Sequence, residues 1–330
     1  MEAIKTLERE YDYRRTSAIK EHETQINSLC KKIPRLEEIN KEIQKLGIEA
    51  SKASLFPNDK SKSKSKKLLL KQIEDLKKEK ESIISSKNIS LEPQYECSLC
   101  KDTGYITTNF QTTMCSCMKQ KLIDHYYNKF NSLRLNDETF ENFDFELYSD
   151  QPSIEKYGAK LSPRDNIKKI RTIAEKFIKN FNDDNTKNLL FVGTAGTGKT
   201  FISGCIANEL LKEGHTIIYQ TAPLLLDSVF EFKYGSKSQK SKDLYENLYN
   251  VDLLIIDDLG TENPSGPKFA ELFTIINSRL LNPKTKTIIS SNLDLNKISK
   301  VYDDRLLSRF IGNYDICKFY GDDIRIVSKK

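Results

Sequence analysis

Apolar residues recur at helical spacing through the first part of the chain. Over residues 1–50 they follow at intervals of three, four and seven, as in Ile19, Ile26, Leu29, Ile33, Leu36, Ile39, Ile43 and Leu46. This stripe predicts an amphipathic helix or helical hairpin. Residues 51–67 carry turn residues and a lysine–serine run, which predicts a hinge or solvated loop. Residues 68–85 repeat the apolar stripe, so a second helix could close an antiparallel hairpin or coiled coil.

A different pattern begins at about residue 162, where short apolar runs alternate with helical periodicity. Predicted strands cover 188–192, 216–220, 253–257 and 285–290, and predicted helices cover 166–181, 199–211, a stretch from about 223, and 267–281. Apolar strands alternating with helices indicate a parallel sheet that is buried between two helical layers. This part of the chain is therefore predicted to have an α/β fold.

Together these patterns predict four domains or segments. They are a helical module over 1–90, a cysteine-rich unit over 91–125, a linker over 126–160 and the α/β domain over 161–330. The helical module is either a partner-binding module or a charged coiled coil that only spaces the other parts.

Composition and charge refine this division. Of 330 residues, 38% are hydrophobic and 30% are charged, so part of the chain is not packed core. Residues 1–90 hold 21 basic and 15 acidic residues, which accounts for the whole net charge of +6. No apolar run approaches the roughly 18 residues that span a bilayer, and the first residues lack a signal core. We therefore expect a cytoplasmic, soluble protein with no membrane partner.

One motif carries the strongest chemical signal. Directly after an apolar strand, the sequence matches G-x-x-x-x-G-K-[ST] at Gly193, Thr194, Ala195, Gly196, Thr197, Gly198, Lys199 and Thr200. Backbone N–H groups of such a loop surround phosphates, the lysine reaches the β- and γ-phosphates, and the threonine ligates Mg²⁺. The alternative is a glycine-rich turn without a nucleotide.

Polar residues at two later strand ends could complete this site. The apolar run 253–256 is followed by Asp257 and Asp258. We expect Asp257 to act on Mg²⁺ and either Asp258 or Glu262 to polarise the attacking water. Asn292 follows the next strand and is expected between these carboxylates and the γ-phosphate, because ligands gather at the carboxyl ends of strands. The alternatives are structural acids at a strand end and an asparagine that caps a helix.

Two arginines, Arg305 and Arg309, stand four positions apart in the segment 304–310. Such a pair on one helical face could offer a guanidinium to the γ-phosphate of a neighbouring subunit, as an arginine finger does. The alternative is a helix that forms surface salt bridges.

With these motifs in order, residues 160–327 resemble the AAA+ ATPases of the DnaC/DnaI bacterial helicase loaders and the related IstB transposition ATPases. The matching segments are 193–200, 221–227, 253–262, 288–292 and 305–310. The resemblance implies an AAA+ P-loop domain that hydrolyses ATP, with Asn292 as sensor 1, Arg309 as the finger and Arg325 as the sensor-2 equivalent. Asp258 departs from the glutamate of many AAA+ proteins. The chain stops five residues after Arg325, so we expect no full C-terminal lid and no DnaA-type initiator.

Four cysteines lie within 21 residues, as the pairs Cys97–Cys100 and Cys115–Cys117. Two close pairs joined by a loop can supply four thiolates to Zn²⁺, whereas free thiols or a redox pair are the alternative. His125 could replace one cysteine. A cysteine-rich segment ahead of the AAA+ domain occurs in DnaI-like loaders, which extends the resemblance to about residue 90.

The segment 230–242 interleaves lysines with aromatic rings. It is interpreted either as a groove that tracks single-stranded DNA or as a flexible, solvated loop. At the other end of the chain, the resemblance to the helicase loaders implies that the N-terminal region holds the replicative helicase, and the expected contact is the face formed by Ile26, Leu29, Ile33 and Leu36.

The main functional hypothesis is an ATP-dependent loader of a DnaB-type helicase hexamer onto single-stranded DNA, with self-association through the ATPase domain and with ATP, Mg²⁺ and Zn²⁺ as cofactors. The first alternative is an IstB-like ATPase that regulates a transposase on duplex DNA. The second is an adaptor that binds ATP without hydrolysing it.

Overall fold

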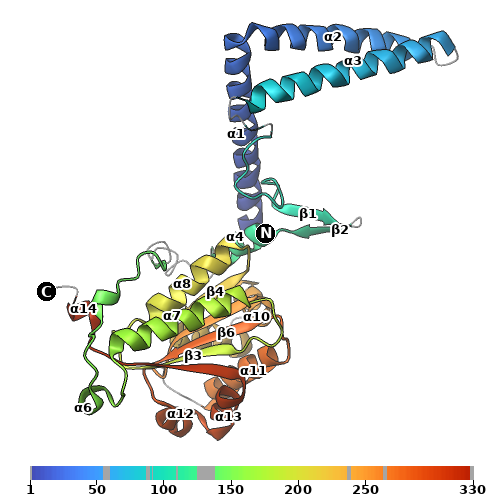
Figure 1. The fold of residues 1–330 in the computed structure, drawn as a ribbon. Helices are drawn as coiled ribbons and strands as arrows, with labels where there is room; N and C mark the ends of the chain where they lie inside the picture. Colours follow the sequence, from blue (N-terminus) through green and yellow to red (C-terminus); the bar gives the residue numbers. More distant parts are fainter. Residues whose placement is uncertain are drawn as a thin grey trace. The chain divides into compact units, whose positions relative to one another are not determined.

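The computed structural model describes residues 2–54, 60–86, 90, 92–108, 111–124, 138–235, 239–262 and 266–327 (Figure 1). The chain divides into two compact units, Met1–Cys115 and Ser116–Lys330. No helix in the described part of the chain is long and apolar enough to cross a membrane.

The first unit begins with three long helices, α1 (Glu2–Lys32), α2 (Pro34–Ser54) and α3 (Lys60–Ser85). Pro34 separates the first two, because a proline ring removes a backbone donor and collides with the carbonyl four residues earlier. In Figure 1, α2 and α3 lie side by side as the predicted hairpin. The prediction of a solvated loop over 60–67 is wrong, since α3 already begins at Lys60.

The apolar stripe of this unit faces inward. Leu29, Leu36 and Ile84 are buried together, with Ile26 and Ile33 packed against them. Leu36 is 0% exposed. The stripe is therefore the seam that joins α1, α2 and α3, and its prediction as the surface for the helicase is wrong.

The first unit ends in a small cysteine-rich segment. After Cys97 and Cys100, the strands β1 (Tyr105–Thr108) and β2 (Gln111–Met114) pair antiparallel. Lys101 and Asp102 both have positive φ, so the chain turns back sharply just after the first cysteine pair.

The second unit is an α/β domain. Its elements are α4 (Ser116–Ile123), η2 (Phe145–Leu147), α6 (Ile154–Tyr157), α7 (Pro163–Lys179), β3 (Asn188–Gly193), α8 (Lys199–Lys212), β4 (Ile217–Thr221), α9 (Ala222–Tyr234), α10 (Gln239–Asn250), β5 (Leu253–Leu259), α11 (Gly266–Leu280), β6 (Lys286–Ser291), α12 (Leu295–Tyr302), α13 (Asp304–Asn313), β7 (Tyr314–Phe319) and α14 (Ile324–Val327).

Five parallel strands form the sheet in the order β4-β5-β6-β3-β7. Alternate strand residues enter two separate cores, one shared with α7 and α8 and the other with α9 to α13. The predicted buried parallel sheet is confirmed. We did not predict β7, because only Tyr314, Cys317 and Phe319 of it are buried and the strand contains no apolar run.

Helices occupy most of the basic segment 230–242. It comprises the end of α9 and the start of α10, and residues 236–238 lie outside the described residues. Lys233 forms an ion pair with Glu271, whose nearest carboxylate oxygen lies 2.6 Å away. The interpretation as a flexible loop is therefore wrong for the described part of this segment.

A side chain covers part of the sheet's edge strand. The Gln120 amide, on α4, donates to the Ile217 carbonyl at 3.1 Å and accepts from the Ile217 N–H at 2.7 Å. This pair of bonds imitates one rung of a β-ladder on β4.

Candidate functional site

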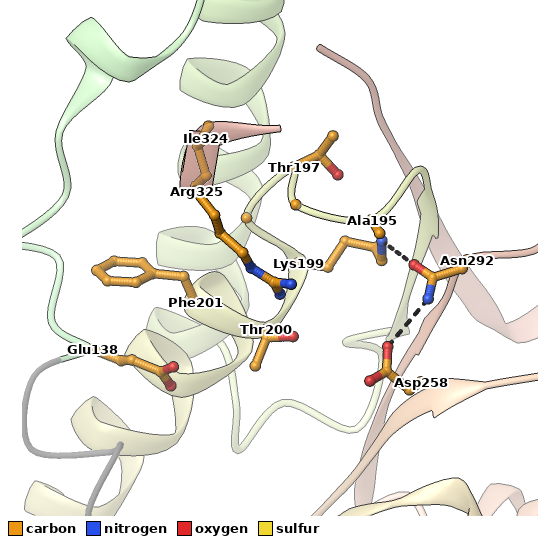
Figure 2. Close-up of a pocket in the computed structure, with 12 residues that line it drawn as sticks. Glu138, Ala195, Thr197, Lys199, Thr200, Phe201, Asp258, Asn292, Ile324 and Arg325 are labelled. Carbon is orange, nitrogen blue, oxygen red and sulfur yellow. Dashed lines mark hydrogen bonds between the residues drawn. The ribbon is translucent and has the colours of Figure 1, made fainter. Parts of the chain in front are cut away.

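The phosphate-binding motif connects β3 to α8, as it must if its N–H groups are to face a ligand at a helix N-terminus. Gly193 has φ +149°, and a Cβ there would lie 1.9 Å from the Phe319 carbonyl oxygen. Gly198, which caps α8, has φ +94°. Both positions therefore demand glycine. The loop borders a pocket of about 670 Å³, which Figure 2 shows in close-up.

Lys199 lies inside this pocket and is only 5% exposed. Its ammonium donates to the carbonyls of Gly193 and Thr194, both at 2.8 Å, and to Asn292 Oδ1 at 2.7 Å. These bonds hold the ammonium where phosphate oxygens would replace the two carbonyls.

Asp257, at the end of β5, is held by three hydroxyl groups. Thr200 Oγ1 and Tyr219 OH donate to its Oδ2 at 3.0 and 3.2 Å, and Ser290 donates to its Oδ1. The predicted Mg²⁺ ligands Thr200 and Asp257 thus lie in direct contact. We did not predict Tyr219 and Ser290, although each lies at the carboxyl end of a predicted strand.

Asp258 turns into the pocket itself. Its backbone has φ +57°, a left-handed conformation that aspartate tolerates, and its N–H donates to Ser290 Oγ at 3.0 Å. Asn292 bridges the site, because its Nδ2 lies 3.4 Å from Asp258 Oδ1 while its Oδ1 accepts from Lys199. Figure 2 shows this chain of contacts. Burial and the neighbouring Asp257 charge raise the pKa of Asp258.

Two predicted catalytic residues lie elsewhere. Glu262 is buried, accepts from the Gly260 N–H at 2.9 Å and from the Tyr302 hydroxyl, and does not line the pocket. Arg309 is exposed on α13, where its Nε donates to Asn277 Oδ1 at 3.1 Å. Neither Glu262 nor Arg309 therefore lines the described pocket of its own chain.

The segment after β7 closes the other side of the pocket. The Ile324 N–H donates to the Gly196 carbonyl at 2.9 Å, and Arg325 points into the pocket beside Lys199 and Thr200 (Figure 2). Arg325 thus lines the pocket, and its role as the sensor-2 equivalent stays a prediction. Glu138, Phe201 and Ile324 complete the lining; we missed all three, because no motif marks them.

We expect nucleotide affinity to fall as the pH rises through about 8. Burial lowers the pKa of Lys199 from 10.5 to about 8, against the opposing effect of Asp258 and Asp257. Phosphates bind the ammonium form, so deprotonation above this pH weakens binding, by about tenfold between pH 7 and pH 9. Fluorescence titration with a labelled nucleotide measures the effect. Lys199→Arg, which stays charged, should show a flat profile, and an equally steep profile in that variant would contradict the assignment.

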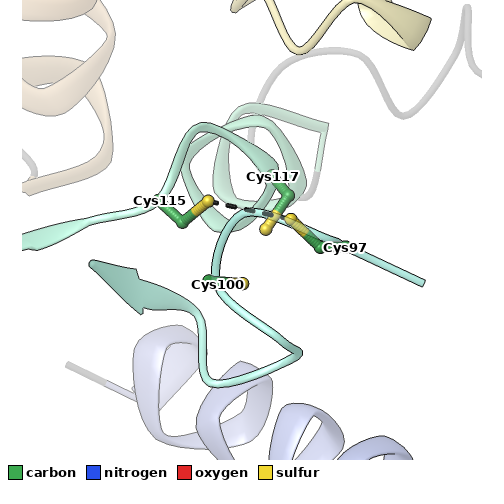
Figure 3. Close-up of side chains that lie close together, drawn as sticks. All are labelled: Cys97, Cys100, Cys115 and Cys117. Atoms are coloured by element: carbon green, nitrogen blue, oxygen red, sulfur yellow. Dashed lines mark hydrogen bonds between the residues drawn. The ribbon is translucent and has the colours of Figure 1, made fainter. Parts of the chain in front are cut away.

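The four clustered cysteines form a second candidate site (Figure 3). The four Sγ atoms all lie within 4.8 Å of one another; they belong to Cys97, Cys100, Cys115 and Cys117. The distance between Cys97 Sγ and Cys115 Sγ is 3.9 Å. A tetrahedral Zn²⁺ with Zn–S bonds of about 2.3 Å separates its sulfurs by about 3.8 Å. The donors therefore fit zinc in number, kind and spacing. His125 lies outside the described residues, and its predicted alternative role stays open.

We expect one zinc ion per chain. Because zinc binds thiolates, acid pH should release it, and Cys100→Ser should lower the zinc content well below one equivalent. Metal analysis of the purified protein, with thiol titration, measures both effects. Cys30→Ser, outside the cluster, is the control. Less than half an equivalent of zinc in the wild type, with all four thiols reactive, would refute the site.

The matching family model lies within the second unit. A sequence model of the family described as IstB-like ATP binding protein matches residues 119–327. The replicative helicase loader DnaC of Escherichia coli (strain K12) is 28% identical over 163 residues, which are 49% of this chain and 64% of that protein. DnaC of Buchnera aphidicola subsp. Schizaphis graminum is 29% identical over 162 residues, with 49% and 65% covered. The match thus spans less than two thirds of these relatives. A solved structure of DnaI is 23% identical with a TM-score of 0.45, covering 58% of this chain and 95% of that one.

Proposed function

Because this chain belongs to the family of IstB-like ATP-binding proteins and has the α/β fold of an AAA+ P-loop domain, we propose that it is an ATPase that loads a replicative helicase onto single-stranded DNA. One observation carries the ATPase part, namely the continuous contact chain Lys199–Asn292–Asp258 along the phosphate loop. The relatives named as replicative helicase loaders support the loading part.

Oxygen donors suited to Mg²⁺ lie side by side in the site. The Thr200 hydroxyl and the Asp257 carboxylate would hold the ion, directly or through water, since Mg²⁺ prefers hard oxygen ligands. The ion would neutralise negative charge on the β- and γ-phosphates. Tyr219 and Ser290 orient the Asp257 carboxylate for this role.

Asp258, rather than Glu262, is proposed to orient the attacking water and accept its proton. Asp258 lines the pocket, and its raised pKa makes it a better proton acceptor than an ordinary aspartate. Glu262 is engaged by Gly260 and Tyr302 outside the pocket. Its proposed role is to hold the turn after β5.

Arg309 is proposed to act on the nucleotide of a neighbouring copy, with Arg325 contacting the nucleotide of its own chain. Arg309 is exposed and absent from the pocket of its own chain, whereas Arg325 lines that pocket. This arrangement requires self-association through the ATPase domain before hydrolysis reaches its full rate.

The helical module is proposed to hold the hexameric helicase through exposed side chains of α2 and α3. Ile48, Leu68 and Leu70 are each about half exposed or more, unlike the buried seam. Apolar side chains on exposed helix faces are typical contacts for a partner protein.

We expect Tyr234→Ala to weaken single-stranded DNA binding by about 1–3 kcal/mol, the usual contribution of one stacked base. Tyr234 is 62% exposed at the end of α9, and its ring centroid lies 4.7 Å from that of Phe230. Fluorescence anisotropy with labelled oligonucleotides at a fixed salt concentration measures the change. Tyr157→Ala, remote on α6, serves as the aromatic control. Equal affinity of the Tyr234 variant and the wild type would exclude this contact.

The loading proposal has a direct test. The protein, the replicative helicase from the same cells and ATP are mixed with circular single-stranded DNA, and DNA-bound helicase is measured after gel filtration. We expect the protein to raise the amount of DNA-bound helicase. The Asp258→Asn variant should hydrolyse ATP more slowly than the wild type. No increase over helicase alone, with ATP hydrolysis intact, would contradict the loading function and leave the ATPase assignment standing.

An IstB-like regulator of a transposase is the second candidate, and the description of the matching family favours it. It predicts preference for duplex over single-stranded DNA and capture of a transposase. Binding of both DNA forms in parallel titrations separates the two functions.

A further inference from the structure

The first half of the long helix α1 is attached to the cysteine-rich segment of its own unit by polar contacts. Arg14 Nη2 donates to Asp102 Oδ1 at 2.8 Å and lies 3.0 Å from Glu96 Oε2. Tyr105 OH donates to Glu8 Oε1 at 2.8 Å. In Figure 1, β1 and β2 lie beside the first half of α1. The segment that carries Cys97 and Cys100 is therefore attached to this helix.

Asp102 is the centre of this attachment. It is 1% exposed, and it follows Cys100 by two residues in a left-handed turn. Its Oδ1 accepts from the Cys97 N–H at 3.0 Å, and its Oδ2 accepts from the Glu96 N–H at 2.9 Å. One buried carboxylate thus holds the backbone of a predicted zinc ligand and, through Arg14, the helix α1.

We propose that Arg14 and Asp102 are positioning residues for the metal site, which couple zinc binding to the attachment of α1. Without the guanidinium, the buried carboxylate loses its charged partner and is driven toward water, because an unpaired buried charge is strongly unfavourable. The Cys97 backbone then loses its support, and the ligand loop must be ordered by the metal alone. Coupling is reciprocal, so zinc that orders the loop also holds Asp102 against Arg14.

The proposal gives the metal a role outside catalysis. The helix α1 leads directly into α2 at Pro34. An attachment at Arg14 therefore restrains the helix from which the rest of the helical module continues. Loss of zinc should therefore loosen the module that is proposed to hold the helicase. The inference rests on the proposal that the four cysteines bind zinc.

The test uses the full-length chain with Arg14→Gln and Asp102→Asn, and with Arg15→Gln as the matched control, since Arg15 is exposed one position further along α1. Zinc affinity is measured by competition with a chromogenic chelator under reducing conditions. Co²⁺ substitution reports the ligand set by its thiolate charge-transfer bands. Both variants should lose about 10–100-fold in zinc affinity, the usual effect of removing a partner of a ligand, and the control should stay within about twofold. Arg14→Lys should regain part of the loss.

Hydrogen exchange gives the second readout. In the wild type, zinc removal should accelerate amide exchange over residues 7–22, whereas Arg14→Gln should exchange fast there with or without zinc. Nucleotide binding by Ser116–Lys330 should be unchanged in every variant, which shows that the second unit is folded.

Three outcomes would overturn the coupling. They are variant zinc affinities within twofold of the wild type, Arg14→Lys binding no tighter than Arg14→Gln, and wild-type α1 exchange that ignores zinc. Absence of cobalt or zinc binding by the wild type would overturn the metal site and the coupling together. The first three outcomes leave the metal site standing, so the two failures are distinguishable.

Discussion

Lys199→Ala should lower the affinity for ATP by about 100-fold or more, because hydrogen bonds from a charged donor contribute about 1.5–3 kcal/mol each and the ammonium can make two to the phosphates. Lys199 is the only lysine that lines the described pocket, and its three present bonds already aim it at the phosphate loop. Isothermal titration with ATP and Mg²⁺ measures the loss.

Lys300→Ala is the control for this prediction, since Lys300 is exposed on α12 and absent from the pocket. A thermal unfolding scan accompanies each titration to show that the variants remain folded. Near-wild-type affinity in a folded Lys199→Ala protein would remove the phosphate loop from the proposed function.

Arg279→Met should destabilise the second unit by about 3 kcal/mol. Each buried carbonyl that loses its donor costs about 1–3 kcal/mol. The methionine carries no charge, so the variant avoids the desolvation penalty of the buried guanidinium, which offsets part of this loss. Arg279 is 2% exposed, and its guanidinium donates to the carbonyls of Leu248, Val251 and Lys286 at 2.7, 3.0 and 2.7 Å. Burial lowers the pKa of Arg279 to about 10, which still leaves it charged at neutral pH.

Differential scanning calorimetry measures this effect as a fall in Tm of about 6–12 °C, given roughly 2–4 °C per kcal/mol for a unit of this size. Arg305→Met tests an exposed arginine of the same unit and should stay within about 0.5 kcal/mol of the wild type. A similar Tm for both variants would show that the Arg279 bonds contribute little.

Features set by contiguous residues were predictable. The phosphate loop, its flanking strand and helix, and the acids at the end of β5 follow one another within short segments, so the local pattern contains the whole feature. The P-loop therefore lies as predicted, with Lys199 and Thr200 in the pocket. Four strands of the sheet were also predictable, because each contains at least two consecutive buried apolar residues.

Features set by tertiary packing were not predictable. The stripe around Leu29 has the same pattern whether a partner or α3 covers it, and only the position of Ile84 decides between them. Asp258 lies near the end of β5 and Glu262 lies just after it, and the different positions of their carboxylates depend on the turn at Gly260 and on Tyr302 from α12. Glu138 and Phe201 belong to no motif, so nothing in the sequence marks their place in the pocket.

The amide of Gln120 has a consequence for how copies of this chain can assemble. An open edge strand is a template for strand addition from another chain, and such pairing leads to domain swapping and aggregation. At Ile217 the donor and acceptor of β4 are already used by the Gln120 side chain. An incoming strand would have to displace a buried amide before it could form its first bonds there. Copies of this chain at high local concentration are thereby protected at this position from joining through their sheets.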